Sequence, residues 1–219
     1  MAIVRAGEVN MYTLYGRSGS GNAAIEALLE EMEVPYRLEM VEKRADGRLA
    51  DELQTLNPLG QVPVLVLPSG AAMTESCAIM IYLADLHSPG QLAPLPASEH
   101  RPAFLRWMVF LAANPYMTDL RLYYSSRYTT DPNGTEGVRK AASRDMAREF
   151  VILAEGIGSG PWLLGETFSA VDVYAAMIAT WAEDVPDMFQ RHPEIAHHFA
   201  RVRSRPKVSP VWERHGWTF

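Results

Sequence analysis

The stretch of residues 57–76, NPLGQVPVLVLPSGAAMTES, constrains the fold more than any other part of this sequence. Turn-forming Asn, Pro and Gly residues precede a short apolar run at 64–67, and a second turn, Pro-Ser-Gly at 68–70, separates it from residues 71–74. Two short apolar runs that are joined and preceded by turns predict a two-stranded hairpin.

Pro63 stands just before the first of these runs. Proline has no N–H to give to a strand ladder, so we expect the backbone of Val62 to face outward, where an extended ligand can pair with it. An ordinary strand-entry proline would have the same sequence, and the Val62-Pro63 bond can be cis or trans. The hairpin therefore predicts a ligand-binding edge but leaves the isomer open.

The other end of the stretch, Thr74-Glu75-Ser76, enters a run with apolar residues at helical spacing from Ile79 to Leu86. Ser76 is then close to a helix N-terminus, where free amides and the helix dipole favour an anion. Glu75 can receive an ammonium group, so the pair suits the head group of an amino acid. Ser76 could equally be a simple N-cap.

The first half of the chain alternates strand and helix patterns. A strand at residues 11–15 is followed by the loop GRSGSGN at 16–22 and by helical spacing from Ile25 to Met32. A dinucleotide fingerprint is disfavoured, because Ala24 stands where the third glycine would be needed. A strand at 36–41 and a weak helical stripe at 43–56 precede the hairpin, which gives the order βαβαββα.

The second half of the chain shows helical patterns only. The segment HSPGQLAPLP at 87–96 indicates a linker, and we expect Asn114-Pro115 to kink the helix that begins after it. Ser169 and Asp172 have the spacing of a capping box at the start of a later helix. We assign Asp172 to folding and not to the site.

Composition and charge exclude several classes of binding partner and of metal or disulfide site. The net charge of -6, with no basic stripe, argues against nucleic acid or an anionic membrane. The sequence has no transmembrane run and no signal peptide pattern, so we expect a cytoplasmic protein. The single cysteine, Cys77, excludes a disulfide framework and a CxxC pair, and the six histidines form no metal-ligand pattern, so we expect no metal.

In these features the chain resembles the cytosolic glutathione S-transferases, in particular bacterial members with a serine in the first loop. The resemblance implies an α/β thioredoxin-like domain at 1–86, a linker at 87–97 and an all-α C-terminal domain at 98–219. It rests on residues spread over nearly the whole chain, at 14–16, 20–22, 57–63, 75–76 and 169–172.

Glutathione, the co-substrate that the resemblance implies, needs help to become a nucleophile. A cysteine thiol ionises near pH 8.5, and only the thiolate reacts well. Lowering that pKa by about two units takes roughly 2.7 kcal/mol, which one or two donors and a helix N-terminus can supply. A serine hydroxyl is too weak a base to remove the proton, so it would act as a donor to the sulfur.

Two serines of the first loop are candidates for that donor. Ser20 is favoured because it is nearer to the helix and matches the Ser-Gly-Asn pattern of some family members, whereas Ser18 fits members with paired serines. Asn22, or an amide near it, is a candidate second donor. Tyr12 and Tyr15 are less favoured alternatives, by analogy with family members that use a phenol at the end of this strand.

The resemblance also implies the rest of the site. Gln61, Val62 and Pro63 would hold the peptide part of glutathione, and Glu75 and Ser76 its γ-glutamyl end. The residues expected to line the pocket for a second, hydrophobic substrate are Arg17, Tyr116 and Tyr123.

We therefore predict a homodimeric glutathione transferase that adds the glutathione thiolate to a hydrophobic electrophile. A glutathione-dependent isomerase or reductase would use the same site. The alternative from another class is a transferase-like subunit that binds a partner without turnover, since fold alone does not establish catalysis.

Overall fold

The computed structural model describes residues 11–42 and 51–218, and the chain divides into two compact units. The first unit combines Met1–Ser88 with Pro206–Phe219, and the second is Pro89–Arg205. The last segment of the chain thus groups with the first unit, whereas the resemblance implied a helical domain that extends over 98–219.

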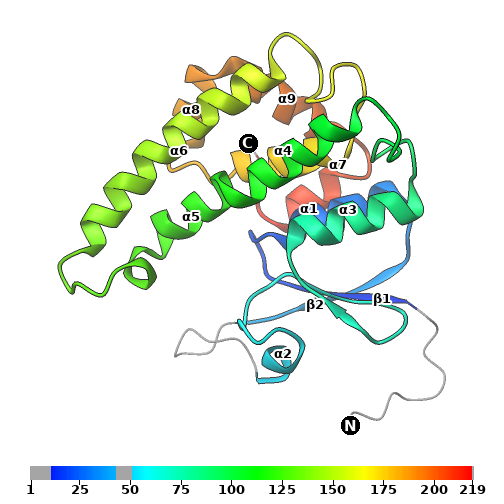
Figure 1. The fold of residues 1–219 in the computed structure, drawn as a ribbon, viewed down its shortest axis with the longest axis horizontal. Coiled ribbons are helices and arrows are strands. Elements are labelled where there is room, and N and C mark those ends of the chain that lie inside the picture. The colour runs from blue at the N-terminus through cyan, green and yellow to red at the C-terminus, as the bar shows by residue number, and fades with distance from the viewer. Residues whose placement is uncertain (1–10, 43–50, 219) are drawn as a thin grey trace. The chain divides into compact units, whose positions relative to one another are not determined.

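The first unit has the predicted order of elements, βαβαββα, followed by a helix from the end of the chain (Figure 1). Of the weak helical stripe predicted at 43–56, residues 51–56 are helical, and 43–50 lie outside the described residues. The elements are β1 (Tyr12–Gly16), α1 (Asn22–Glu31), β2 (Tyr36–Met40), α2 (Asp51–Leu56), β3 (Val64–Val66), β4 (Ala72–Met73), α3 (Ser76–His87) and α10 (Ser209–Arg214).

The four strands form one mixed sheet in the order β2-β1-β3-β4. Strand β1 runs parallel to β2 and antiparallel to β3, with Tyr15 opposite Val64, and β4 runs antiparallel to β3. The end of β1, the start of β3 and the end of β4 therefore lie at the same end of the sheet. Three chain segments, at 17–21, 61–63 and 74–76, meet there.

Helices cover both faces of this sheet (Figure 1). Leu53 of α2 packs with Val64 on one face, and Tyr15 contacts this small cluster. Successive side chains of a strand point to opposite faces, so fully buried Leu14 points to the other face, which α1 and α3 cover. The sheet is thus fixed between helices, and the three segments at its end start from a rigid base.

The second unit is helical throughout its regular elements in the described residues, which confirms the predicted all-α domain. Every residue of α7 is buried, so this helix forms the centre of the unit. None of the helices described in either unit is long and apolar enough to span a membrane. The elements are α4 (Arg101–Ala113), α5 (Pro115–Tyr123), a 3-10 turn (Ser125–Tyr128), α6 (Thr135–Ile157), α7 (Ala170–Ala179), α8 (Val185–Arg191) and α9 (Pro193–Arg203).

Two local predictions in this unit can be compared with the structure. The kink predicted at Asn114-Pro115 is instead a full break between two helices, because α4 ends just before Asn114 and α5 begins at Pro115. The capping box at the start of α7 is present: the Ser169 N–H donates to Asp172 Oδ2 at 2.8 Å. Asp172 Oδ1 also accepts from the Leu163 N–H at 2.8 Å and lies 2.9 Å from His198 Nε2.

A glycine in α6 permits close packing against an aromatic ring of α4. A Cβ atom placed on Gly156 would lie 2.1 Å from the Trp107 ring, whose residue is itself buried. In contrast, a Cβ on Gly137 of the same helix would meet nothing within 4 Å.

We expect Gly156→Ala to lower the free energy of unfolding by about 1–3 kcal/mol, because the indole has to move within a packed interior. Gly137→Ala is the matched control and should raise it by up to about 1 kcal/mol through helix propensity. Urea unfolding of both variants measures this contrast, and equal effects of the two substitutions would contradict the close packing.

A buried carboxyl group makes the stability of the helical unit depend on pH. Asp119 of α5 is 9% exposed, and its Oδ1 has no hydrogen-bond partner among the described residues. Burial raises the pKa of Asp119 to about 7, whereas an unfolded aspartate ionises near 3.9. The stabilising effect of the neutral carboxyl is therefore complete below about pH 4 and is lost as the pH rises through about 7.

We expect Asp119→Asn, which cannot ionise, to raise the free energy of unfolding at pH 8.5 by roughly 2–4 kcal/mol relative to the original protein. The difference should shrink as the pH falls and vanish near pH 4. Unfolding curves across this pH range test the prediction, and a difference that is independent of pH would refute it.

Candidate functional site

The candidate site lies where the three segments at one end of the sheet come together. The loop at 17–21 carries both candidate serines, residues 61–63 carry the predicted peptide-binding edge, and residues 74–76 carry the predicted head-group pair. The antiparallel pairing of β3 with β1 and β4 is what brings these distant parts of the sequence to one place.

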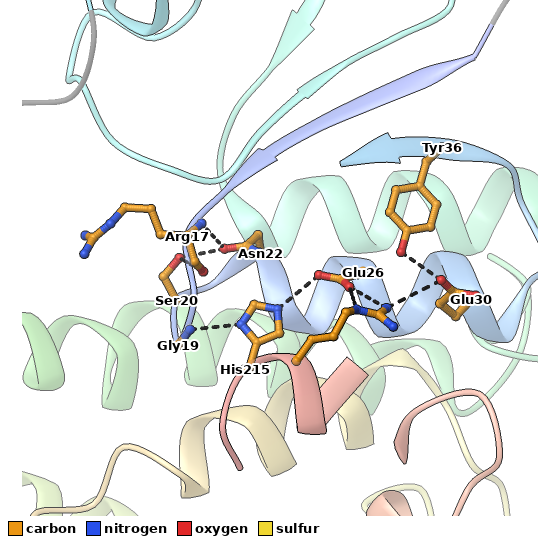
Figure 2. A network of polar contacts seen from close by, with 9 residues as sticks. Arg17, Gly19, Ser20, Asn22, Glu26, Glu30, Tyr36 and His215 are labelled. Carbon is orange, nitrogen blue, oxygen red and sulfur yellow. Dashed lines mark hydrogen bonds and ion pairs between the residues drawn. The ribbon is translucent and has the colours of Figure 1, made fainter. Parts of the chain in front are cut away.

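A buried amide side chain closes the first loop. Asn22 has no exposed surface, and its Oδ1 accepts hydrogen bonds from the Arg17 N–H at 2.9 Å and from the Ser20 hydroxyl at 2.6 Å (Figure 2). Its Nδ2 is buried without a hydrogen-bond partner among the described residues. In this structure the side chain of Asn22, which was predicted as a second donor to the sulfur, holds the loop.

The end of β1 has to be glycine for this arrangement. A Cβ atom on Gly16 would lie 2.1 Å from Asn22 Cγ, so any side chain would displace the amide that holds the loop. The Leu-Tyr-Gly end of the strand therefore has a steric role.

The two candidate serines lie in different surroundings. Ser20 is half-buried, and its hydroxyl lies 3.1 Å from the Arg17 carbonyl oxygen as well as close to Asn22. It is two residues before the start of α1, where the first amides of the helix lack helical partners. Ser18 is exposed, and its side chain takes part in none of the hydrogen bonds found in the described part of the chain.

The second segment is shaped by Asn57, which the sequence marked only as a turn former. Asn57 is buried, its Nδ2 donates to the Gln61 carbonyl at 2.8 Å, and its Oδ1 accepts from the Leu59 N–H at 3.1 Å. The Val62-Pro63 peptide bond is cis. Because the described ladder between β1 and β3 ends at Val64, Val62 lies beyond the ladder, at the end of the sheet where the three segments meet.

The third segment places an acidic side chain in solvent at the start of a helix. Glu75, and not Ser76, is the N-cap residue of α3, and it is exposed. Its φ of 67° and ψ of 100° are unusual for a residue with a side chain, and such a backbone is held in place only by its surroundings. Ser76 is the first residue of the helix and is buried.

The alternative nucleophile-activating groups lie away from the serine loop or are poorly ionised. Tyr12 starts β1, its hydroxyl lies 2.8 Å from His87 Nε2, and burial raises the pKa of Tyr12 to about 12. Tyr15 packs in the cluster under α2. Burial also raises the pKa of Cys77 in α3 to about 11, so this residue is a thiol at neutral pH.

The residues predicted for a second-substrate pocket belong to different units. Arg17 is half-buried in the first unit. In the second unit the structure brings Tyr116 and Tyr123 to the same residue, Trp181: the Tyr116 ring packs edge-on against the indole with centroids 5.0 Å apart, and the Tyr123 hydroxyl donates to the Trp181 carbonyl at 3.3 Å. Among the described residues, no cluster of His, Cys, Asp or Glu is arranged to hold a metal ion.

Sequence reasoning missed two buried residues that support the serine loop. His215 Nδ1 accepts a hydrogen bond from the Gly19 N–H at 2.9 Å, and His215 Nε2 lies 3.0 Å from Glu26 Oε2 (Figure 2). Glu26 is the one charged residue in the apolar run at 23–29, and a charge within such a run could have indicated a buried carboxylate with a partner. Nothing in the sequence around His215 connects it with the loop.

Comparison with known proteins gives matches over most of the chain. Residues 24–86 match the family described as "Glutathione S-transferase, N-terminal domain", and residues 112–206 match "Glutathione S-transferase, C-terminal domain". The uncharacterized GST-like protein YncG of Escherichia coli K12 is 31% identical over 93% of this chain and 98% of that protein.

Two further relatives differ in the activity that their names give. Glutathione S-transferase GstA of Escherichia coli O157:H7 is 26% identical, over 93% of this chain and 98% of its own length. Disulfide-bond oxidoreductase YfcG of Escherichia coli K12 is 25% identical, over 90% of this chain and 92% of its own length.

Solved structures show the same fold. A glutathione transferase from Methylococcus capsulatus superimposes with a TM-score of 0.81 at 25% identity, over 94% of this chain and 99% of the other. A glutathione transferase homologue from Sulfitobacter with bound glutathione has a TM-score of 0.84 at 23% identity, over 94% and 98% of the two chains. With these matches in both halves of the sequence, the chain belongs to the glutathione S-transferase family.

Proposed function

We propose that this protein is a glutathione transferase, which stabilises the thiolate of glutathione and adds it to a hydrophobic electrophile. The observation that carries the proposal is the meeting of the serine loop, the edge at Val62 and the head-group pair at Glu75 and Ser76 at one end of the sheet. Membership of the family and the relative GstA, which is named a glutathione S-transferase, support it.

The γ-glutamyl end of glutathione carries both an ammonium and a carboxylate. The exposed carboxylate of Glu75 is the partner for the ammonium, and the N-terminus of α3 with the Ser76 hydroxyl suits the carboxylate. The unusual backbone at Glu75 fits a residue that is held in position for binding.

The peptide part of glutathione is an extended chain that can pair with a free backbone. Val62 lies beyond the described ladder of β3, so its N–H and carbonyl are positioned to add glutathione as a further extended segment, and Pro63 ends that pairing. Asn57 fixes the carbonyl of Gln61, which leaves the neighbouring Val62 well defined before glutathione arrives.

The sulfur is then placed at the serine loop. When Ser20 turns its hydroxyl from Asn22 Oδ1 to the sulfur, it stabilises the thiolate, and Asn22 still holds the Arg17 amide. The thiol proton goes to solvent, since the serine acts as a donor and not as a base. The thiolate attacks the electrophilic carbon, and Tyr116, Tyr123 and Arg17 stay the residues predicted to contact that substrate.

Glutathione-dependent disulfide reduction is the second candidate, because the relative YfcG is named a disulfide-bond oxidoreductase. Here the glutathione thiolate attacks one sulfur of a disulfide and releases the other as a thiolate. The thiolate of a second glutathione then attacks the glutathione sulfur of the mixed disulfide, which forms glutathione disulfide and releases the second substrate sulfur as a thiolate. Cys77 is a poor participant because burial raises its pKa. A homodimer, which the resemblance implies, and a cytoplasmic location stay predictions.

We expect glutathione bound to the original protein to ionise well below the pKa of free glutathione. Ser20→Ala should raise the pKa of bound glutathione by about one to two units, which corresponds to about 1.4–2.7 kcal/mol of lost thiolate stabilisation. Ser18→Ala is the matched control in the same loop and should leave it nearly unchanged. A pH titration of the ultraviolet absorbance of the thiolate measures all three proteins.

The titration separates the proposals. A loss of the shift only in Ser18→Ala would assign the donor to Ser18, and bound glutathione that remains a thiol in the original protein would refute activation of the sulfur. A protein that does not bind glutathione at all would favour the non-catalytic alternative.

Glu75 allows binding and backbone strain to be tested separately. We expect Glu75→Gly to weaken glutathione binding about 10- to 100-fold, since a charge-assisted hydrogen bond is lost. The free energy of unfolding should stay the same or rise by about 1 kcal/mol, because glycine adopts positive φ without strain.

Titration calorimetry and urea unfolding measure these two quantities. Glu75→Gln, which keeps the size of the side chain, should lose a similar part of the affinity, and exposed Glu213→Gln serves as the control for removal of one negative charge. Unchanged affinity in Glu75→Gly would rule out this residue as the ammonium partner.

A further inference from the structure

The end of the chain is built into the first unit beside the serine loop. In this segment Val211 and Trp212 are fully buried, and the Trp212 ring packs edge-on against Trp217 with centroids 5.3 Å apart. His215 is 5% exposed and stacks on Trp217, also with centroids 5.3 Å apart. The imidazole is therefore held in one orientation by packing.

The partners of His215 determine which of its nitrogens carries the proton. The Gly19 N–H can only donate, so Nδ1 has to accept; the Glu26 carboxylate accepts, so Nε2 carries the hydrogen (Figure 2). Glu26 has no exposed surface, and its other oxygen accepts from Arg214 Nε at 2.9 Å and Nη2 at 2.6 Å. The neutral imidazole satisfies every contact of this network.

The hydrogen bond from Gly19 fixes the loop between the two candidate serines. Gly19 is exposed, has a φ of 69° and offers no side chain for packing, so the amide is the group by which its position can be fixed. Asn22 holds the loop on either side of this point, at Arg17 and at Ser20. His215 supplies the third support, in the middle.

We propose that His215 is a positioning residue for the sulfur of glutathione: its neutral Nδ1 holds the Gly19 amide and thereby sets where the serine hydroxyl can point. This inference rests on the proposed function of the loop. His215 and the serine loop both lie outside the ranges 24–86 and 112–206 that match the family, and the inference rests on the contacts of His215 in this structure. Glu26 and Arg214 act one step further away, since they orient the imidazole.

The test compares two substitutions at His215. His215→Phe keeps an aromatic ring on Trp217 but has no acceptor, whereas His215→Asn places an amide oxygen near the position of Nδ1. We expect His215→Phe to raise the pKa of bound glutathione and to lower kcat about three- to tenfold, which is the range for the loss of one hydrogen bond. The affinity for glutathione should change less. His215→Asn should restore most of the original pKa and of the original kcat.

A readout without glutathione tests the geometry itself. The Gly19 amide should exchange its hydrogen slowly in the original protein, about three- to tenfold faster in His215→Phe, and slowly again in His215→Asn. Lys207→Ala is the control in the same segment, because the Lys207 ammonium makes a surface ion pair with Glu33 at 2.8 Å and its removal should change none of these quantities.

The outcomes distinguish this inference from the proposed function. If the original protein leaves bound glutathione as a thiol, the proposed function fails and the inference fails with it. If the original protein ionises glutathione and folded His215→Phe does so equally well, with an unchanged Gly19 amide, the inference alone is overturned. A loss of ionisation that His215→Asn does not rescue, with the Gly19 amide still protected, would also overturn it.

Discussion

The first unit depends on one carboxylate that has no contact with solvent. An ionised Glu26 in the interior would cost several kcal/mol if it were left alone, so its three hydrogen bonds are a condition for folding and not an addition to it. Two of them come from Arg214, which lies 188 residues further along the chain, and one comes from its neighbour His215. Burial of this group on α1 therefore requires the end of the chain to be in place, and the end of the chain in turn supports the loop at Gly19.

The helical unit contains a second buried carboxylate with a similar arrangement and a different consequence. Asp172 accepts from the backbone amides of Leu163 and Ser169 and lies against His198, so one side chain joins the start of α7, the segment before it and α9. Both networks place a histidine on a carboxylate inside the protein. In the helical unit, the contacts of Asp172 only join parts of the fold to one another. In the first unit, the contact of Glu26 with His215 continues through the imidazole to Gly19, in the loop that carries candidate site residues.

The sequence predicted the features that neighbouring residues determine. The hairpin, the helix that begins beside Glu75 and the capping box at Ser169 follow from turn residues, apolar spacing and side chains that contact their own backbone. The contact of His215 with Gly19 could not be predicted in the same way, because it joins residues 196 positions apart and exists only when α10 packs on α1. The positive φ of Glu75 could not be predicted either, because glutamate has no preference for such a backbone and its presence in a sequence gives no signal for it.

The candidate site presents few charged side chains. Each sequence motif that predicts it is therefore weak when taken alone. Where a ligand pairs with backbone amides and carbonyls, the residues that determine binding are those that fix the backbone, such as Asn22 and Asn57, and those that leave room for it, such as Gly16. Such residues appear in a sequence as turn formers, although their side chains make specific buried contacts. A backbone fixed before the ligand arrives loses little entropy on binding. In the function that we propose, the binding energy of glutathione is then available to place its sulfur, and the proposed serine donor has to supply only one hydrogen bond to the charge that develops there.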